Sequence, residues 1–186
     1  MPFTVNLTTS NAGTGNSRVY SYSSTAFYPV DGRGFGNYYL YSGTAHNYNF
    51  AFAYHGVFTY QGDESFSFTG DDDLYVYVND RIAMNLGGVH SAESGSFNIT
   101  WPTNGCPLAS YPNVACYTKA GGISSYPCAC LLGLSAPTNG NSYNIDIFYN
   151  ERHTTASDLT FSTSLYIYCA WYDWCGVCQG NGQTCW

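Results

Sequence analysis

The stretch from Gly62 to His90 has a two-residue hydrophobic period on both sides of three consecutive aspartates. Phenylalanine alternates with serine and threonine over residues 65–69, and leucine and valine alternate with tyrosine over residues 74–78. The pair Asn79-Asp80 is a turn signal, and residues 82–86 alternate again. Because successive side chains of a strand point to opposite faces, this period is typical of half-buried β-strands. The stretch therefore predicts three strands with a two-residue hairpin turn between the second and the third.

The three aspartates Asp71, Asp72 and Asp73 lie at a strand junction and not in a polar tail. Three carboxylates this close repel one another unless a cation or water separates them. Calcium is the usual partner of such oxygen-rich loops, since it takes 6–8 hard oxygen ligands in flexible geometry. The alternative is a solvated acidic turn, and spacing alone favours that alternative because an acidic triplet is not a metal motif by itself.

The same alternation recurs along the rest of the chain and predicts about nine strands in all. The further strands are expected at residues 3–7, 48–54, 57–60, 97–101, 143–149 and 159–167. No β-α-β pattern and no nucleotide-binding glycine loop is present. Short strands joined by frequent turns are typical of a sandwich. We therefore expect an all-β fold, an antiparallel and jelly-roll-like β-sandwich.

Eight cysteines form an even set, which is typical of disulfide-bonded proteins outside the cell. They are Cys106, Cys116, Cys128, Cys130, Cys169, Cys175, Cys178 and Cys185. Four of them lie in a long insertion at residues 102–137, and disulfides are expected to hold that insertion in place. Eight cysteines permit 105 pairings, so the sequence leaves the connectivity open. A zinc cluster of the last four cysteines is the alternative, whereas the one-residue gap between Cys128 and Cys130 is not a usual zinc spacing.

Composition excludes several classes of partner. The net charge is −7, only 9% of residues are charged, and Lys119 is the single lysine. Binding to nucleic acid or to an anionic membrane needs lysine and arginine, so neither is expected. No apolar run is long enough to span a bilayer. Asn6 and Asn98 begin N-glycosylation sequons, which is consistent with secretion. Because residues 1–10 have no signal segment, we expect a mature fragment or a start other than the natural one.

Five separated segments resemble the fibro-slime family, a branch of the ligand-binding β-sandwich domains named after anthrax protective antigen. They are YPVDGRGFGN, HNYNFAF, GDDDLYVYVND, NLGGVH and YNERHTTASDL, in that order over nearly the whole chain. The C-terminal segment WYDWCGVCQGNGQTCW resembles the short cysteine repeats that follow this domain in fibro-slime proteins of social amoebae. The resemblance implies a β-sandwich over residues 1–168 and a cysteine-rich tail over residues 169–186. Those repeats often have Asp where this chain has Asn181, which leaves metal binding by the tail open.

The resemblance also implies a metal site. In lectin-like relatives, two adjacent aspartates joined by a cis peptide bind calcium, and the calcium binds sugar hydroxyls. The corresponding pair is Asp71 and Asp72, while Asp73 is either a further ligand or a turn residue. In these relatives a distant loop completes the coordination of the ion, and here Asn150 and Asp158 are the candidate ligands from such a loop.

Further residues of the same loops are candidates for ligand binding. Backbone carbonyls near Gly87 and Gly88 are expected to help hold the ion. Glu151 and Arg152 match a fibro-slime signature, and we expect an ion pair between them in preference to catalysis. His90 and His153 are expected at the same end of the sandwich. Neutral histidines bonded to loop backbone are favoured there over metal ligands.

We find no catalytic motif, neither a nucleophile elbow nor HExxH, and expect no enzyme. The sequence leaves two functions open. One is an extracellular structural or adhesion protein, part of a matrix, coat or filament, in which calcium stiffens loops and the chains self-associate. The other is a calcium-dependent, lectin-like module that binds a glycan or another cell-surface partner. The high tyrosine content, 19 residues, favours the first.

Overall fold

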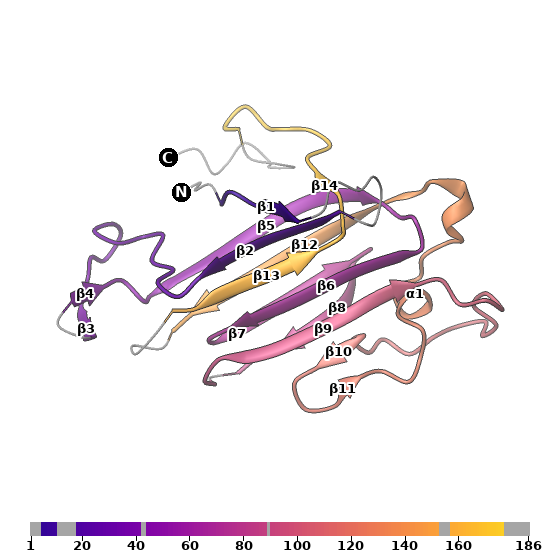
Figure 1. Cartoon of the computed structure of the whole chain (residues 1–186), viewed down its shortest axis with the longest axis horizontal. Coiled ribbons are helices and arrows are strands. Elements are labelled where there is room, and N and C mark those ends of the chain that lie inside the picture. Colours follow the sequence, from indigo (N-terminus) through magenta and orange to yellow (C-terminus); the bar gives the residue numbers. More distant parts are fainter. Residues whose placement is uncertain (1–4, 11–17, 42–43, 89, 153–156, 177–186) are drawn as a thin grey trace.

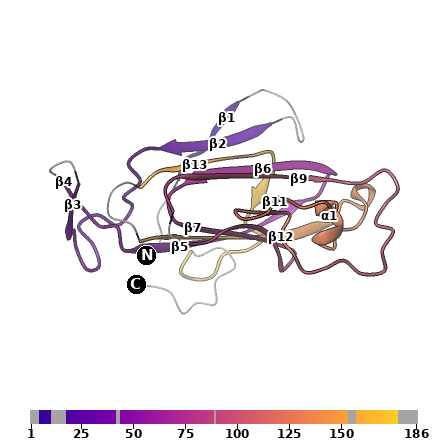
Figure 2. The same ribbon diagram turned by 90° about the horizontal axis from the view of Figure 1, so that it is seen from below.

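The computed structural model describes the chain except for residues 1–4, 11–17, 42–43, 89, 153–156 and 177–186. Two β-sheets face each other in the described part (Figures 1 and 2), which confirms the all-β sandwich. The strands are β1 (Thr8–Ser10), β2 (Val19–Ser24), β3 (Tyr39–Tyr41), β4 (Thr44–His46), β5 (Phe50–Thr59), β6 (Asp63–Gly70), β7 (Asp73–Val78), β8 (Arg81–Leu86), β9 (Glu93–Thr100), β10 (Tyr117–Thr118), β11 (Gly122–Ile123), β12 (Ser142–Glu151), β13 (Leu159–Thr163) and β14 (Ile167–Tyr168). Two helical turns accompany them, α1 (Cys128–Leu131) and η2 (Pro137–Asn139). None of the helices described is long and apolar enough to cross a membrane.

One sheet has five strands in the order β1-β2-β13-β6-β9, and the other has seven in the order β11-β10-β8-β7-β12-β5-β14. Strands β3 and β4 form a separate hairpin. Among the described strands, β8 pairs with β10 in parallel and the other pairings are antiparallel. The longest pairing joins β12 to β5 over ten residues, and β12 also pairs with β7, so β12 lies centrally in the larger sheet.

The core fills the space between the two sheets with the inward residues of each alternating strand. In β6 every second residue from Glu64 to Gly70 is buried, and in β7 the buried faces are Leu74, Val76 and Val78. Large side chains that are almost fully buried include Phe58, Tyr60, Phe66, Met84, Leu86, Ile99, Ile145 and Tyr149. Burial of this apolar surface is the main favourable contribution to folding.

The predicted hairpin between β7 and β8 is confirmed. Asn79 and Asp80 have φ angles of 51° and 58°. A two-residue turn with positive φ at both positions matches the right-handed twist of the strands, and Asn and Asp tolerate that conformation best among residues with a Cβ.

Disulfides hold the insertion in place, as expected. Cys106 bonds to Cys130, and Cys116 bonds to Cys128. Both bonds end at α1, which packs against β9. In the tail, Cys169 and Cys175 are also disulfide-bonded, which favours disulfides over a zinc cluster there. Cys178 and Cys185 lie outside the described residues.

Several strand boundaries differ from the expectation. The first strand of the described residues is Thr8–Ser10; residues 5–7 of the strand expected at 3–7 are not in a strand, and residues 3–4 lie outside the described part. Strands β2, β3, β4, β10 and β11 were not predicted. Residues 48–54 and 57–60 belong largely to one strand, β5. The strand expected at 159–167 breaks after Thr163, because the chain leaves the five-stranded sheet there and joins the seven-stranded sheet as β14. The Thr163 hydroxyl accepts the Leu165 N–H at this break, which satisfies a donor that has left the sheet.

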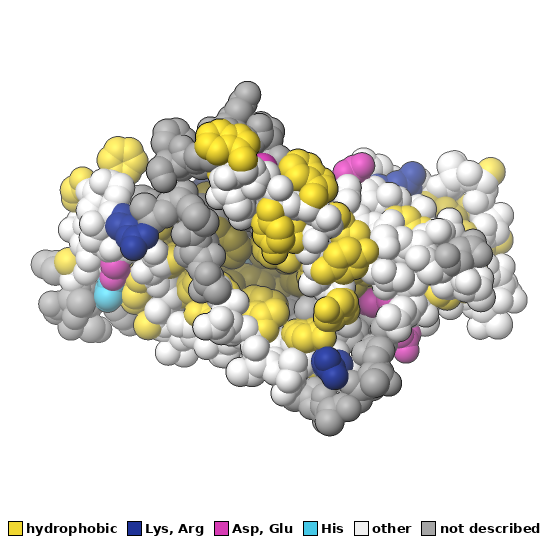
Figure 3. Space-filling view, turned by 90° about the horizontal axis from the view of Figure 1, so that it is seen from above, with side chains coloured by type: hydrophobic (Ala, Val, Ile, Leu, Met, Phe, Trp, Pro, Cys, Tyr) yellow, Lys and Arg dark blue, Asp and Glu magenta, His cyan; other side chains and the backbone are white. Residues whose placement is uncertain are grey.

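The sandwich is open along the edge formed by β1 and β14. Tyr20 and Tyr166 contact across this edge, with ring centroids 6.1 Å apart. Figure 3 looks onto it and shows hydrophobic side chains gathered in and around a hollow. Exposed aromatic side chains continue from β14 into the tail: Tyr166, Tyr168, Trp171, Tyr172 and Trp174.

Candidate functional site

The acidic triplet joins β6 to β7 and meets the loops that follow β8 and β12. Asp71 donates its backbone N–H to the carbonyl of Asp158, 3.4 Å away. Asp72 and Asp73 accept hydrogen bonds from Arg152 and Gly88. The structure therefore brings the loops that follow β6, β8 and β12 together at one end of the sandwich.

Asp72 is fully buried and holds an unusual backbone conformation. Its φ angle is +57°, a region that residues with a Cβ seldom adopt and that is often strained at functional sites. Its Oδ2 accepts the backbone N–H of Arg152 at 2.7 Å. Its Oδ1 is buried and accepts no hydrogen bond from the residues that the structure describes. A buried carboxylate oxygen in this state costs free energy, and a cation would offset that cost.

The peptide between Asp71 and Asp72 is trans, so the cis peptide implied by the resemblance is not found. The chain instead changes direction through the left-handed conformation of Asp72. Asp71 is also buried, 6% exposed, and lies directly after the last residue of β6. The two carboxylates are thus withdrawn from bulk water, which excludes the solvated acidic turn as a description of this loop.

Asp73 has a different role, because three donors occupy its carboxylate. The Gly88 N–H binds Oδ1 at 2.5 Å, while the Asn150 amide and the Arg152 guanidinium bind Oδ2 at 3.3 Å and 2.6 Å. Asn150 is the register partner of Asp73 between β12 and β7. Asp73 therefore ties β7, β12 and the loop after β8 together.

The ion pair expected between Glu151 and Arg152 is replaced. Arg152 pairs with Asp73, and the fully buried Glu151 accepts the Tyr149 hydroxyl at 3.1 Å. The reason is strand alternation: Glu151 is an inward residue of β12, whereas Arg152 follows the end of that strand. Burial, and then the nearby Glu151 carboxylate, raise the pKa of Tyr149 well above its ordinary value. His153 lies outside the described residues.

The loop Gly87 to His90 is shaped by its glycines and by the histidine. A Cβ on Gly87 would lie 2.0 Å from the Tyr75 hydroxyl, and Gly88 has a φ of +110°. The His90 ring is buried, with Nδ1 2.8 Å from the Ser91 carbonyl and Nε2 2.9 Å from the Leu86 carbonyl. This confirms a histidine bonded to loop backbone.

Hard oxygen atoms dominate this site, which is the donor chemistry that calcium prefers. Within the described residues, no group of three or more His, Cys, Asp or Glu side chains converges for a metal ion. A calcium ion at Asp71 and Asp72 would therefore need backbone carbonyls or water as further ligands. Buried carboxylates and the Asp72 Oδ1 atom fit such an ion, whereas the carboxylate of Asp73 already has three partners.

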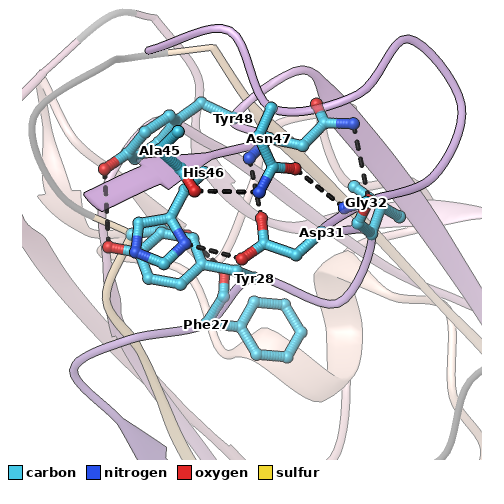
Figure 4. Close-up of polar contacts among 11 residues, drawn as sticks. Phe27, Tyr28, Asp31, Gly32, Ala45, His46, Asn47 and Tyr48 are labelled. Atoms are coloured by element: carbon cyan, nitrogen blue, oxygen red, sulfur yellow. Dashed lines mark hydrogen bonds and ion pairs between the residues drawn. The ribbon is translucent and has the colours of Figure 1, made fainter. Parts of the chain in front are cut away.

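Sequence reasoning missed a polar cluster before β5. His46 Nδ1 lies 2.6 Å from Asp31, and its ring stacks on Tyr28 with centroids 3.6 Å apart (Figure 4). Asp31 also accepts the Asn47 N–H at 2.7 Å. The segments YPVDGRGFGN and HNYNFAF each contain one side of this cluster, but no spacing rule pairs them. The neighbouring Phe27 and Ser157 exchange two 2.8 Å bonds, which connect the cluster to the loop after β12.

A groove opens on the outer face of the seven-stranded sheet beside Asp73. Its volume is about 410 Å³. The small residues Ala51 and Ala53 of β5 lie opposite Asn150 and Phe148 of β12, and Asp73 and Tyr75 of β7 complete the wall. The signal for this groove was present in the sequence as alanine alternating with aromatic residues over 50–54, but alternation does not reveal which neighbours flank a strand.

The comparisons with known proteins give relatives whose names state no activity. No family model and no solved structure matches the chain. The chain is similar to psi proteins of Dictyostelium discoideum. Protein psiH is 38% identical over 173 residues, which are 90% of this chain and 20% of psiH. Proteins psiQ and psiI are 34% and 37% identical over 194 and 190 residues, covering 100% of this chain and 16% and 21% of the relatives. The chain therefore spans about a fifth of the length of these relatives.

Proposed function

We propose that the chain is a non-enzymatic, calcium-binding β-sandwich module of an extracellular matrix or adhesion protein, of the fibro-slime type. The observation that carries the proposal is the buried acidic loop. Asp72 is fully buried and has a left-handed backbone, and within the described part of the chain one of its carboxylate oxygens has no hydrogen bond. A fold retains so costly an arrangement when a bound group offsets its cost.

Asp71 and Asp72 would hold the ion through carboxylate oxygens. Its charge would compensate two buried negative charges. Asp73, Asn150 and Arg152 would hold the surrounding loops in position through the bonds described above, without contacting the ion. In this proposal Asp73 holds the loops together and does not bind the ion. Asp158 contributes through its backbone carbonyl, which accepts the Asp71 N–H.

An extracellular location is supported by the disulfides and by the low charge of the surface. Disulfides form and persist in oxidising compartments and are rare in the cytosol. Asn6 and Asn98, the two sequon residues, are both exposed and available to a glycosyltransferase. Exposed aromatic residues along the open edge are consistent with self-association into a matrix or filament.

The proposal is tested by thermal unfolding of the disulfide-intact protein in calcium and in chelator. Binding at a hundredfold excess over Kd stabilises by about 2.7 kcal/mol, which corresponds to roughly 5–10 °C in Tm for a domain of this size. We expect this shift in the wild type and not in Asp72→Asn. Asp80→Asn is a matched control, because Asp80 has nearly the same φ, 58°, but is exposed at the far end of β7. Equal shifts in all three proteins would contradict the proposal.

The adhesive part of the proposal has its own readout. Beads coated with the protein should aggregate, or bind to isolated matrix, in calcium and separate in chelator. A calcium-induced Tm shift without any aggregation or matrix binding would leave the ion as a stabiliser and would remove the adhesion proposal.

Calcium-dependent carbohydrate binding is the second candidate function. The observation that favours it is the groove beside Asp73, which adjoins the proposed ion site and combines aromatic with polar groups. Its test is a glycan array probed in calcium and in chelator. A signal that disappears with chelator supports it, whereas no signal under either condition contradicts it.

A further inference from the structure

We propose that the groove on the outer face of the seven-stranded sheet binds the ring of a neutral saccharide directly, without a metal bridge. The inference shares only the ligand class, a carbohydrate, with the second candidate function. It differs in needing no calcium, because the groove is a surface separate from Asp71 and Asp72. The groove is lined by Ala51, Ala53, Phe148 and Tyr75, with Asp73 and Asn150 at one end.

The shape of the groove suits a ring lying along the sheet. Ala51 and Ala53 are successive outward residues of β5, and each pairs with a larger outward residue of β12, Asn150 and Phe148. The two methyl side chains leave a trough that the neighbouring side chains border. Its volume of about 410 Å³ lies within the range of small-ligand sites, roughly 300–1,000 Å³.

The chemistry of the lining selects a polyhydroxylated ring over other ligands. The C–H face of a pyranose packs on aromatic rings, while its hydroxyls need acceptors and donors at the rim. Phe148 and Tyr75 supply the aromatic surface, and Asn150 supplies an amide whose nitrogen is engaged by Asp73, so that its oxygen remains an acceptor for a hydroxyl.

Charge excludes ionic ligands. Among the described residues that line the groove, Asp73 is the single one with a formal charge, and the Arg152 guanidinium 2.6 Å away compensates it. An anionic ligand would therefore be repelled by the Asp73 carboxylate, because the Arg152 charge is already used by Asp73. A cationic ligand would gain little, because the Asp73 carboxylate is already paired with Arg152. A neutral ligand loses least on entering such a site.

Phe148 is held in position before any ligand arrives. Its ring contacts His55 and Tyr77 edge-on, with centroids 5.8 Å and 6.0 Å away. His55 is itself fixed by Asp146, whose Oδ1 lies 2.6 Å from its Nδ1. A ring that is already ordered loses little conformational entropy on binding, and this compensates for the openness of the groove.

The test is saturation-transfer NMR on the disulfide-intact protein with the methyl glycosides of glucose, galactose, mannose, N-acetylglucosamine and glucuronic acid. Each glycoside is measured in calcium and in chelator. Phe148→Ala removes the stacking ring, and Ala53→Leu fills the trough. Tyr54→Ala is the matched control, since Tyr54 is 40% exposed against 39% for Phe148. Tyr54 lies in β5, beside β12, but points to the opposite face of the sheet. Circular dichroism confirms that each variant is folded.

We expect at least one neutral glycoside to bind in calcium and in chelator alike, about tenfold more weakly in Phe148→Ala, since an aromatic contact contributes roughly a tenfold factor. Binding should be lost in Ala53→Leu and retained in Tyr54→Ala. Binding that vanishes in chelator and ignores Phe148 would overturn the inference while supporting the calcium-dependent candidate. Binding of the glucuronide alone, or of no glycoside at millimolar concentration, would also overturn the inference. The proposed ion site would still be tested separately, by the calcium-induced Tm shift.

Discussion

Replacing Asp73 with alanine should destabilise the loop end of the sandwich far more than removing the positive charge of its partner Arg152. Asp73 is nearly buried, its side chain 11% exposed, and it accepts bonds from Gly88, Asn150 and Arg152. Hydrogen bonds to a charged group contribute about 1.5–3 kcal/mol each, but the Asn150 bond is long and the Arg152 side chain is 44% exposed. Solvent screening reduces such an exposed ion pair to about 0–1 kcal/mol. Asp73→Ala should therefore cost about 3 kcal/mol, most of it from the Gly88 and Asn150 bonds.

The assay is urea unfolding in chelator, followed by tryptophan fluorescence and circular dichroism, so that no metal contributes. Arg152→Met is the control, because it keeps the aliphatic stem and removes only the ion pair, and it should cost no more than about 1 kcal/mol. Equal losses in the two variants would refute the reasoning, since they would place the stabilisation in the ion pair. A cost below 0.5 kcal/mol for Asp73→Ala, taken as roughly the scatter for surface substitutions, would refute it too.

Three further predictions concern the core and the insertion. Tyr149→Phe should cost about 1–3 kcal/mol in urea unfolding, because the buried Glu151 loses a donor; an unchanged midpoint would show that this bond contributes nothing. Burial raises the pKa of Glu64 above its ordinary value of 4.5, so the stability linked to its protonation is complete below pH 4.5 and is lost as the pH rises through the raised pKa. The unfolding free energy of the wild type should thus fall relative to that of Glu64→Gln as the pH increases from 4.5, and a constant difference would disprove the shift. Replacing Cys106 and Cys130 by alanine opens a loop of 24 residues and should cost about 3 kcal/mol, measured by chemical denaturation of the oxidised protein; a cost near zero would mean that the insertion is held by packing alone.

The fold was predictable where a strand has one buried face and one polar face. Residues 62–86 gave β6, β7 and β8 together with their turn, because a shift of one residue would expose every inward side chain. Strand β2 was missed since its inward residues include Tyr20 and Tyr22, whose amphipathic side chains blur the contrast between faces. The break after Thr163 was missed because continuous alternation cannot show that a chain changes sheets.

The sequence and the family resemblance predicted which loops meet at this end of the sandwich but not the bonds between them, and the calcium site itself stays a prediction. The triplet lies beside Asn150 and Asp158, a proximity that the family resemblance implied. Which carboxylate is occupied depends on the register between β7 and β12, which places Asn150 opposite Asp73 and not Asp72. The partner of Arg152 depends on where β12 ends. Neither register nor strand end is fixed by local spacing, so the distinct roles of Asp72 and Asp73 emerged only from the structure.

The most direct test of the central proposal is a calorimetric titration of calcium into the disulfide-intact protein, with Asp72→Asn measured in parallel. Asn tolerates the left-handed backbone of position 72, so this variant removes the charge while keeping the fold. We predict one calcium ion bound by the wild type and none by the variant at the same concentrations. No heat of binding at millimolar calcium, or equal binding by both proteins, would contradict the assignment of Asp71 and Asp72 as a calcium site.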